Sequence, residues 1–389
     1  MTPCPIAVVG AGITGTAVAG LLVGRGRAVT LFERAEACRA VGAGILLQPP
    51  GQDMLARMGL LEGVAAQSAV IGVLNAERSD GRRLTWLPYG ELGEGVHGLG
   101  VRRGVLYEAL LGRCREAGVT VRAGCEVVGR RVTAEGVFVD FADGGSAGPF
   151  GGVVACDGSR SKLREAGGLP FRSAEYEFAA VWYVGPNRAV TDRLYQIVDG
   201  PDRLIGLLPT GEETCSFFWG ERADRFEALR AAGLDAWRDE VVSLCPEAAE
   251  TVAAIGSFDD VTFATYRHVT MPRWHDGATV FLGDAAHATS PHLGQGASLG
   301  LVDAEAFADA VDGADSFAEA CRLYERRRRG TLNYYSLLTR LLTPFFQSDS
   351  RVLALGRDTA LPVLPRLPWV RGQMLKSMSG RKRGWFRDW

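Results

Sequence analysis

The chain of 389 residues is predicted to be an α/β protein with a Rossmann-like nucleotide-binding domain, an inserted antiparallel β-sheet domain and a helical C-terminal region. Three observations predict this fold. A buried strand, a glycine-rich turn and a helix follow one another at the N-terminus, short alternating strands fill residues 176–266, and a helical pattern begins at Thr331. Because a chain of this length exceeds one hydrophobic core, we expect two or three lobes.

The N-terminal turn predicts a dinucleotide site. The apolar run from Ile6 to Val9 reads as a buried parallel strand, and GAGITG follows it at residues 10–15. In such a turn the first glycine permits the tight bend, the second lets the backbone approach a pyrophosphate, and the third lets the helix pack on the strand. A second strand ends at Glu33, where a carboxylate can bind a ribose hydroxyl, so the ligand is FAD or NAD.

A second glycine-rich turn, GDAAHATSPHLGQGASLG at residues 283–300, favours a flavin over a nicotinamide cofactor. Asp284 follows an apolar strand over residues 278–282, and the segment 294–296 opens a helix that starts near Ala297. A simple NAD dehydrogenase needs no second turn of this kind, whereas the turn can hold the other half of a long cofactor. Its glycines let a flat ring lie against the backbone at a helix N-terminus.

These motifs resemble the class A flavoprotein monooxygenases, the aromatic hydroxylase family typified by p-hydroxybenzoate hydroxylase. The family's three signatures appear as GAGITG at 10–15, CDGSRSKLR at 156–164 and GDAAHATSPHLGQG at 283–296. Segments 42–64, 102–110 and 324–329 are similar as well. The chain departs from the family at Val302, where an acid is more common, and at Cys156, where Ala or Gly is more usual. The resemblance implies an FAD-binding domain of the glutathione-reductase type.

The resemblance also implies roles for individual residues toward a non-covalently bound FAD. Glu33 is expected to hold the adenosine ribose, Arg103 to reach the phosphate region, and Asp284 to hold the ribityl chain. Backbone amides of residues 294–296 would meet the flavin pyrimidine ring, and Pro291 would lie beside its reactive face. The complete predicted set is Gly10, Gly12, Ile13, Thr14, Gly15, Glu33, Arg34, Gly44, Arg103, Val127, Asp157, Asp284, Pro291, Gly294, Gln295, Gly296 and Ala297. No Cys/His cluster has metal-ligand spacing, so no metal site is expected.

The reductant is expected to be NADPH or NADH as a transient co-substrate, because the sequence holds only one GxGxxG turn and hence no separate nicotinamide domain. In the family that the chain resembles, the segment around Asp157 and Gly158 is implicated in the transient binding of the nicotinamide co-substrate. The alternative is that Asp157 only caps the helix near Ser161.

The segment 176–265 is the aromatic-rich part of the chain and suits the walls of a planar substrate. Its aromatic residues include Trp182, Tyr183, Tyr195, Phe217, Phe218 and Trp219. Because strands alternate, about half of these side chains are expected to pack in the core instead. Hydroxylation works best on a phenolate, so a base is expected near the substrate. The candidates are His97, His268, His292, Tyr183 and Tyr195, with His292 preferred because it follows Pro291.

The implied reaction is that NAD(P)H reduces FAD, O2 adds to give a flavin 4a-hydroperoxide, and one oxygen atom passes to an aromatic or heteroaromatic small molecule. The segment LTPFFQSD at residues 342–349 is similar to the quinolone- and quinone-modifying branch of the family, which suggests a lipophilic biosynthetic intermediate. Two alternatives stay open. One is a flavin-dependent reductase or dehydrogenase on the same fold, and the other is a non-catalytic FAD-binding protein.

We expect the FAD-binding domain to comprise residues 1–75, 97–175 and 266–315, the substrate-binding sheet residues 76–96 and 176–265, and the helical region residues 316–389. A net charge of −2 argues against nucleic acid as a partner. Scattered cysteines without a CxxC pair fit a reducing cytoplasm. Basic and aromatic residues in RKRGWFRDW at 381–389 suggest weak contact with a membrane surface, and we expect a monomer or homodimer.

Overall fold

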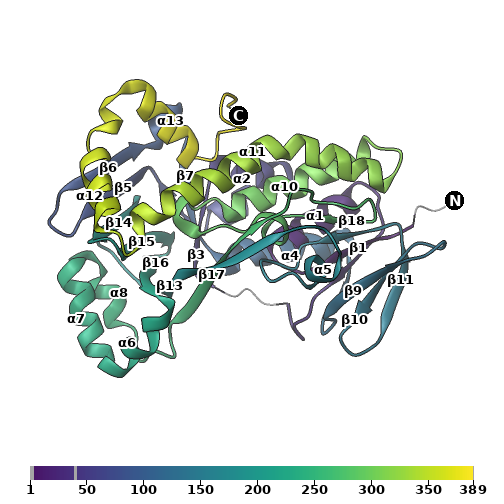
Figure 1. Ribbon diagram of the computed structural model, residues 1–389, viewed down its shortest axis with the longest axis horizontal. Helices are drawn as coiled ribbons and strands as arrows, with labels where there is room; N and C mark the ends of the chain where they lie inside the picture. Colours follow the sequence, from purple (N-terminus) through teal and green to yellow (C-terminus); the bar gives the residue numbers. More distant parts are fainter. Residues whose placement is uncertain (1–3, 39–41, 389) are drawn as a thin grey trace.

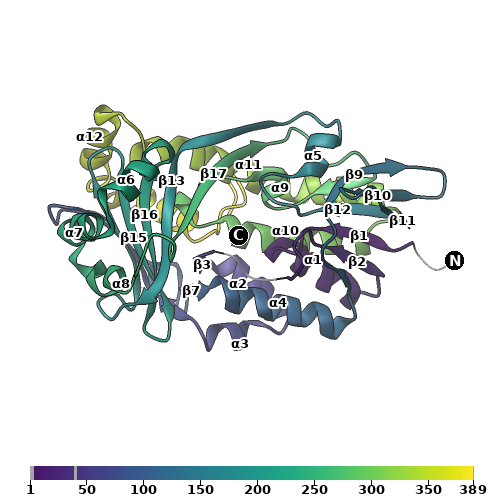
Figure 2. The same ribbon diagram turned by 90° about the horizontal axis from the view of Figure 1, so that it is seen from below.

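A computed structural model describes residues 4–38 and 42–388 as an elongated molecule (Figure 1). A nucleotide-binding domain lies at one end and a seven-stranded sheet with flanking helices lies at the other. The view from below shows the two ends connected by the long strands β13 and β17 (Figure 2). The fold class predicted from the sequence is therefore confirmed.

A five-stranded parallel sheet forms the centre of the nucleotide-binding domain. Its spatial order is β18 (Thr279–Phe281), β12 (Gly152–Ala155), β1 (Ile6–Val9), β2 (Val29–Phe32) and β8 (Thr120–Arg122). Every neighbouring pair is parallel. Strands β1 and β12 are buried along their whole length, as expected of apolar strands covered on both faces. The predicted first two strands and the strand before residue 283 are thus confirmed.

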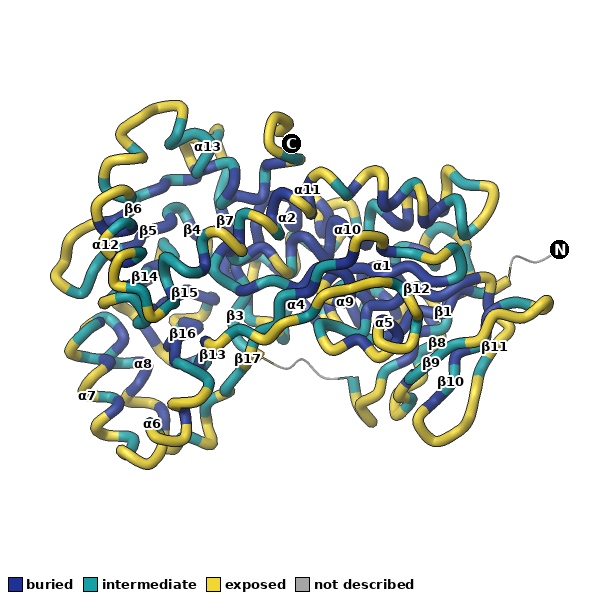
Figure 3. The backbone as a smooth tube through the Cα atoms, viewed as in Figure 1, coloured by how far each residue is buried: buried dark blue, intermediate teal, exposed yellow. Residues whose placement is uncertain are grey.

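Helices cover this sheet and bring its glycine-rich turns together. Their bounds are α1 (Ile13–Gly24), α2 (Pro49–Arg57), α3 (Leu61–Ala65), α4 (Arg103–Ala117), α5 (Lys162–Ala166), α9 (Asp284–His287) and α10 (Gly296–Asp312). Helices α1 and α10 pack closely, because a Cβ added at Gly300 would lie only 2.2 Å from Thr14 Oγ1. Figure 3 shows this centre as the most deeply buried part of the tube.

A seven-stranded sheet makes up the second lobe. Its order is β17 (Thr262–Thr270), β13 (Arg172–Pro186), β16 (Thr214–Arg222), β15 (Arg203–Gly211), β14 (Arg193–Asp199), β5 (Val73–Arg78) and β6 (Arg83–Pro88). The predicted antiparallel pairing of the four strands β13 to β16 is confirmed. The pair β14 and β5 is parallel, since β5 enters from a segment a hundred residues earlier. The domain boundaries themselves stay predictions.

Several elements were not predicted. Three helices, α6 (Phe226–Ala232), α7 (Leu234–Leu244) and α8 (Ala249–Ala253), interrupt the strands of the second lobe and cover one face of its sheet. Two three-stranded sheets also form, one from β9 (Val127–Val132), β10 (Val137–Phe141) and β11 (Ser146–Phe150), the other from β3 (Gly44–Leu47), β7 (Gly98–Arg102) and β4 (Ala69–Ile71).

The C-terminal region is helical, as predicted. Helix α11 (Phe317–Phe346) begins earlier than the expected Thr331 and runs from the nucleotide-binding domain to the sheet of the second lobe (Figure 1). The helices α12 (Arg351–Ala360) and α13 (Pro368–Met378) follow, separated by the proline-rich segment 361–367. Within residues 4–38 and 42–388, no helix is both long and apolar enough to cross a membrane.

Candidate FAD and substrate site

The turn after β1 has two glycines fixed by packing and one that faces open space. Gly10 adopts a φ of +98°, and an added Cβ there would lie 2.4 Å from the Cys156 carbonyl oxygen. A Cβ at Gly15 would lie 1.8 Å from the carbonyl oxygen of Gly10. At Gly12 an added Cβ would meet nothing within 4 Å. The turn therefore leaves its middle glycine bare, which is the geometry that a pyrophosphate needs.

Glu33 stands at the end of β2 and holds this turn. Its carboxylate accepts hydrogen bonds from the Ala11 N–H at 2.8 Å and the Ala35 N–H at 2.9 Å. The carboxylate is thus beside the glycine turn, where a ribose would follow the pyrophosphate. Its neighbour Arg34 is exposed, and Arg103 is exposed at the first residue of α4. Ile13 is buried in α1 and Val127 is buried at the start of β9.

The segment 156–164 packs against the second glycine-rich turn. Asp157 Oδ2 accepts a hydrogen bond from the Leu163 N–H at 3.2 Å, while Ser161 caps α5 by accepting from the Arg164 N–H. Burial raises the pKa of Asp157. The capping interpretation of Asp157 is therefore seen in the structure, and a role toward the nicotinamide stays a prediction.

Arg164 is a structural link that sequence reasoning missed. Its side chain is buried, and its guanidinium donates to the Ala285 carbonyl at 2.8 Å and to the Ser159 carbonyl at 2.7 Å. Since Ala285 lies in the turn after β18, Arg164 connects the second signature motif to the third. Arg164 is part of the motif CDGSRSKLR, but nothing in the spacing of that motif indicated that its partner is the Ala285 carbonyl.

A buried ion-pair network fixes the turn after β18. Asp303, in α10, lies 2.5 Å from His287 Nε2 and accepts from Arg328 Nε at 2.7 Å. It also accepts from the Gly283 N–H at 3.1 Å. Burial alone would raise the pKa of Asp303, but its partners His287 and Arg328 hold it below its ordinary value. His287 thus takes part in the packing that fixes this turn.

This network leaves Asp284 free to meet a ligand. Asp284 begins α9, and it is exposed in a turn whose neighbours Ala285 and Ala286 are fully buried. Thr14, from the first motif, lies against the same turn, because a Cβ at Gly283 would be 2.7 Å from Thr14 Oγ1. The first and third motifs therefore meet, as a cofactor spanning both would require.

The loop before α10 presents backbone to the same region. Gly294 adopts a φ of +59°, and an added Cβ at Gly296, the first residue of α10, would meet nothing within 4 Å. The Gln295 side chain turns away, since its Nε2 donates to the Met378 carbonyl at 2.7 Å. Ala297 and Pro291 are half-buried. The bare backbone at this helix N-terminus suits a flat, electron-accepting ring.

The two domains are connected at Gly44, in β3. Its N–H donates to Ser216 Oγ at 3.0 Å, and an added Cβ would lie 2.6 Å from the Ser216 Cβ. Ser216 belongs to β16, so the FAD-binding domain touches the sheet at this point.

The sheet of the second lobe has two differently covered faces. One face carries Phe218 and Trp182, whose rings meet edge-to-face at 4.8 Å between centroids, and Trp182 Nε1 donates to the Tyr266 hydroxyl at 2.9 Å. Phe346, at the end of α11, packs on this group. Its ring lies 6.2 Å from that of His292. Aromatic side chains and the loop after Pro291 thus come together on this face.

His292 is held as a neutral imidazole. Its Nδ1 lies 2.9 Å from Ser290 Oγ, whereas its Nε2 has no hydrogen-bond partner within the described part of the chain. Burial lowers the pKa of His292 to about 4. A group with this pKa is a weak proton acceptor, so the geometry favours hydrogen bonding over proton removal.

Tyr183 and Tyr195, two of the predicted catalytic candidates, lie on the other face of the sheet, which the helices of the second lobe cover. Tyr195 packs with Phe217 and Trp219 against α7, and its hydroxyl lies 3.3 Å from Glu247 Oε1. The Tyr183 hydroxyl donates to the Ala254 carbonyl at 3.3 Å. Successive residues of a strand point to opposite faces, so Tyr183 is turned away from the face that carries Trp182.

A family model described as an FAD binding domain matches residues 3–311. The chain belongs to this family. The protein is an FAD-dependent monooxygenase, and several of its relatives carry the word monooxygenase in their names. The 3-amino-4-hydroxybenzoate 2-monooxygenase of Streptomyces cremeus is 31% identical over 346 residues, which cover 83% of this chain and 82% of that protein.

Another relative of this monooxygenase is the 2-heptyl-3-hydroxy-4(1H)-quinolone synthase of Mycobacteroides abscessus, 29% identical over 330 residues that cover 83% of this chain and 85% of that one. Among solved structures, Klebsiella pneumoniae HpxO complexed with FAD and uric acid aligns with a TM-score of 0.81 at 22% identity, covering 97% of each chain. The predicted family, fold and FAD dependence of the monooxygenase are thereby confirmed.

Proposed function

We propose that this monooxygenase hydroxylates a lipophilic aromatic or heteroaromatic compound at the face of the seven-stranded sheet that carries Trp182 and Phe218, with NADPH or NADH as reductant. The observation that carries the proposal is that the two glycine-rich turns meet at Thr14, while His292 in the second turn contacts Phe346 of the aromatic group. Bound FAD supplies the redox chemistry: it accepts hydride from the nicotinamide and reacts with O2.

The described residues fit FAD. The bare Gly12 would accept the pyrophosphate, Glu33 the adenosine ribose, and the exposed Asp284 a ribityl hydroxyl. The open backbone at Gly296 would hold the ring edge that becomes negative on reduction, because a helix N-terminus stabilises negative charge.

The substrate is expected to be planar and largely apolar, because the wall consists of aromatic rings with few charges. The names of the relatives above contain a hydroxybenzoate and a quinolone, and HpxO was solved in complex with uric acid, so each is associated with a planar ring. The unpartnered Nε2 of the neutral His292 would hydrogen-bond to a polar group on the substrate ring. Burying the reacting carbon against Trp182 and Phe218 would exclude water.

The FAD assignment is tested by replacing Asp284. Asp284→Ala removes the exposed carboxylate, and we expect FAD affinity to fall about tenfold or more, as for a lost hydrogen bond to a charged group. Asp315→Asn is the control, because Asp315 is also an exposed aspartate but lies before α11, outside the two glycine-rich turns. Flavin titration followed by fluorescence measures both. Equal affinity in the two variants would remove Asp284 from the site.

We also propose that the C-terminal region contacts an anionic membrane surface. Ten of the thirteen large apolar side chains exposed in the described residues follow residue 330: Leu337, Leu341, Val352, Leu355, Val363, Leu364, Leu367, Trp369, Trp385 and Phe386. Helix α12 exposes apolar side chains and buries a charged one. Val352 is 79% and Leu355 66% exposed, while Arg357 is buried and donates to the Phe345 carbonyl. Exposed cations such as Arg366 border the apolar residues.

The tail itself fits this contact only in part. Lys382 is buried, and its Nζ donates to Asp388 Oδ1 at 2.8 Å and to the Gln373 side chain, so it is not available to lipid. Trp389 lies outside the described residues. Phe386 is fully exposed and Trp385 is about half exposed.

Vesicle sedimentation tests the membrane contact. We expect binding to phosphatidylglycerol vesicles, weaker binding to phosphatidylcholine vesicles, and loss of binding in the double variant Val352→Asp and Leu355→Asp. The membrane proposal is wrong if the wild-type chain binds neither kind of vesicle. If light scattering then shows that the wild type is a dimer and the double variant a monomer, the apolar face contacts a second copy of the chain.

A further inference from the structure

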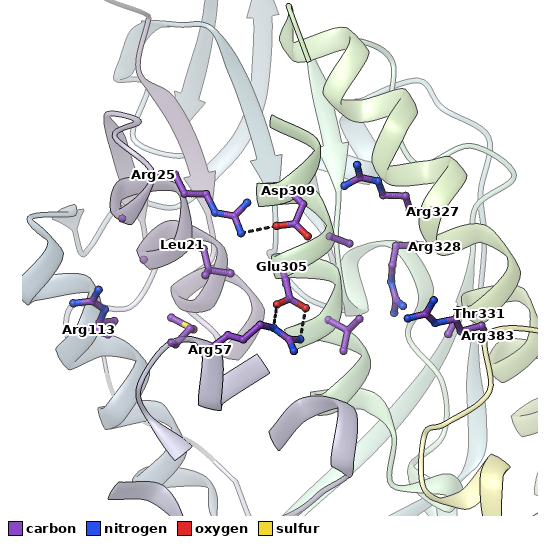
Figure 4. A pocket seen from close by; sticks show the side chains of 15 residues that line it. Leu21, Arg25, Arg57, Arg113, Glu305, Asp309, Arg327, Arg328, Thr331 and Arg383 are labelled. Atoms are coloured by element: carbon purple, nitrogen blue, oxygen red, sulfur yellow. Dashed lines mark hydrogen bonds and ion pairs between the residues drawn. The ribbon is translucent and has the colours of Figure 1, made fainter. Parts of the chain in front are cut away.

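A pocket of about 790 Å³ lies among helices α1, α2, α4, α10, α11 and the C-terminal segment (Figure 4). None of the residues predicted to bind FAD lines it. Six arginines line it against two carboxylates, and they are Arg25, Arg57, Arg113, Arg327, Arg328 and Arg383. The catalytic assignment above does not use any of them at the cofactor.

The two carboxylates of the pocket are already neutralised. Glu305 receives both arms of the Arg57 guanidinium, and Asp309 accepts from Arg25 Nη2 at 2.6 Å, as Figure 4 shows. Arg328 has its own partner, the buried Asp303. Arg25, Arg57 and Arg328 therefore already have carboxylate partners among the described residues.

Arg327 is the cation without a counter-charge. No hydrogen bond or ion pair joins it to any residue within 4–38 and 42–388, although it lines the pocket beside Arg328. Among the described residues, Arg113 of α4 forms an ion pair with Glu116 at 3.9 Å, in which the Arg113 side chain is 40% exposed and the Glu116 side chain 72% exposed. Arg383 lies on the same side as Arg327 and Arg328 (Figure 4). Like charges gathered in one hollow repel, and an anion relieves this.

The lining of the pocket has an apolar part, here called the floor, and a part formed by arginines, here called the rim. Leu21, Met58, Val302 and Ala306 contribute apolar surface, and Gly24 leaves open space because an added Cβ would meet nothing within 4 Å. An apolar floor beneath guanidinium groups matches a ligand with a flat ring and a phosphate. Arginine forks bind phosphate oxygens in pairs, which gives such a rim geometric selectivity.

We propose that this pocket is a second ligand site, separate from the FAD site, that binds a nucleotide through its phosphates. The phosphates contact Arg327 with Arg383 beside it, and the ring lies on the floor formed by Leu21 and Met58. This inference does not depend on the proposed substrate, because it concerns binding to the FAD-loaded protein and not turnover.

Isothermal titration of the FAD-saturated enzyme with ADP tests the proposal. FAD must be present so that ADP does not enter the cofactor site. We expect saturable binding that weakens about tenfold or more in Arg327→Gln, as for a lost charge-assisted hydrogen bond. Arg326→Gln is the matched control, because Arg326 is exposed on the same helix and does not line the pocket.

Inorganic pyrophosphate separates the two parts of the ligand. Tighter binding of ADP than of pyrophosphate supports the nucleotide assignment, and equal binding overturns the role of the apolar floor. Absence of saturable binding by either probe, or equal affinity in Arg327→Gln and Arg326→Gln, overturns the site itself. Both substitutions are at exposed positions, so the thermal unfolding of each variant is expected to match that of the wild type.

Discussion

The carboxylate of Asp303 lies 2.5 Å from Nε2 of His287, and both side chains are buried. Through its bonds to the Gly283 N–H and to Arg328, the same carboxylate joins the turn after β18 to helices α10 and α11. The position of Asp284, one residue beyond Gly283, therefore depends on the buried charge of Asp303, which lies 20 residues beyond Gly283 in the sequence.

Asp303→Asn is expected to lower the free energy of unfolding by about 3 kcal/mol or more, because it leaves the buried guanidinium of Arg328 without its counter-charge. Urea denaturation of the FAD-free protein measures this. Asp309→Asn in the same helix is the control, since its ion pair is half-exposed and is expected to contribute less than about 1 kcal/mol. Equal losses in the two variants would contradict the account of the network.

Gly12→Ala and Gly15→Ala are expected to fail in different ways. A methyl group at Gly12 meets no protein atom, so the chain should fold normally and bind FAD more weakly. A methyl group at Gly15 would overlap the Gly10 carbonyl oxygen, so that variant should unfold at a lower temperature even without FAD. Thermal unfolding and flavin titration separate the two effects. Normal FAD affinity in Gly12→Ala would argue against pyrophosphate at this turn.

His292 is expected to make stability depend on pH on the acid side. Its pKa in the folded chain is lowered to about 4, below an unfolded value of about 6.5, so the unfolded chain binds the proton first. The stability linked to His292 is therefore present above about pH 6.5 and is lost as pH falls toward 4. The difference in denaturation midpoint between the wild type and His292→Gln, followed from pH 7.5 to pH 4.5, measures it. A difference that does not change with pH would contradict a neutral, partly buried His292.

Tyr195→Phe is expected to leave kcat/KM within about twofold, because Tyr195 lies on the face of the sheet covered by α7. Tyr266→Phe removes the acceptor of the Trp182 indole N–H on the opposite face and is expected to raise KM. Steady-state kinetics with an accepted substrate compares the two. A larger effect of Tyr195→Phe than of Tyr266→Phe would place the substrate on the Tyr195 face of the sheet and contradict this account.

The nucleotide-binding half could be predicted because its physics is local. A tight turn, an approach to phosphate and a close helix contact each require glycine, so the spacing of Gly10, Gly12 and Gly15 predicts the turn without knowledge of distant residues. The apolar strands at 6–9 and 279–281 are likewise indicated by composition alone.

The substrate half could be predicted only as a sheet. Alternation indicates that Trp182 and Tyr183 point in opposite directions, but it does not say which face meets the cofactor. The three helices α6 to α8 decide this by covering the Tyr183 face, and the chain between the strands did not indicate that packing. The partners of Arg164, Asp303 and Arg357 also depend on tertiary contacts between segments distant in the sequence.

The most direct test of the central claim follows labelled oxygen. The FAD-loaded enzyme is incubated with NADPH or NADH, ¹⁸O₂ and a panel of hydroxybenzoate and quinolone compounds. The masses of the products are then measured by mass spectrometry. The account predicts a product that contains one ¹⁸O atom, with NAD(P)H consumed. Consumption of NAD(P)H that yields a reduced product without labelled oxygen would contradict a monooxygenase and favour a reductase on the same fold.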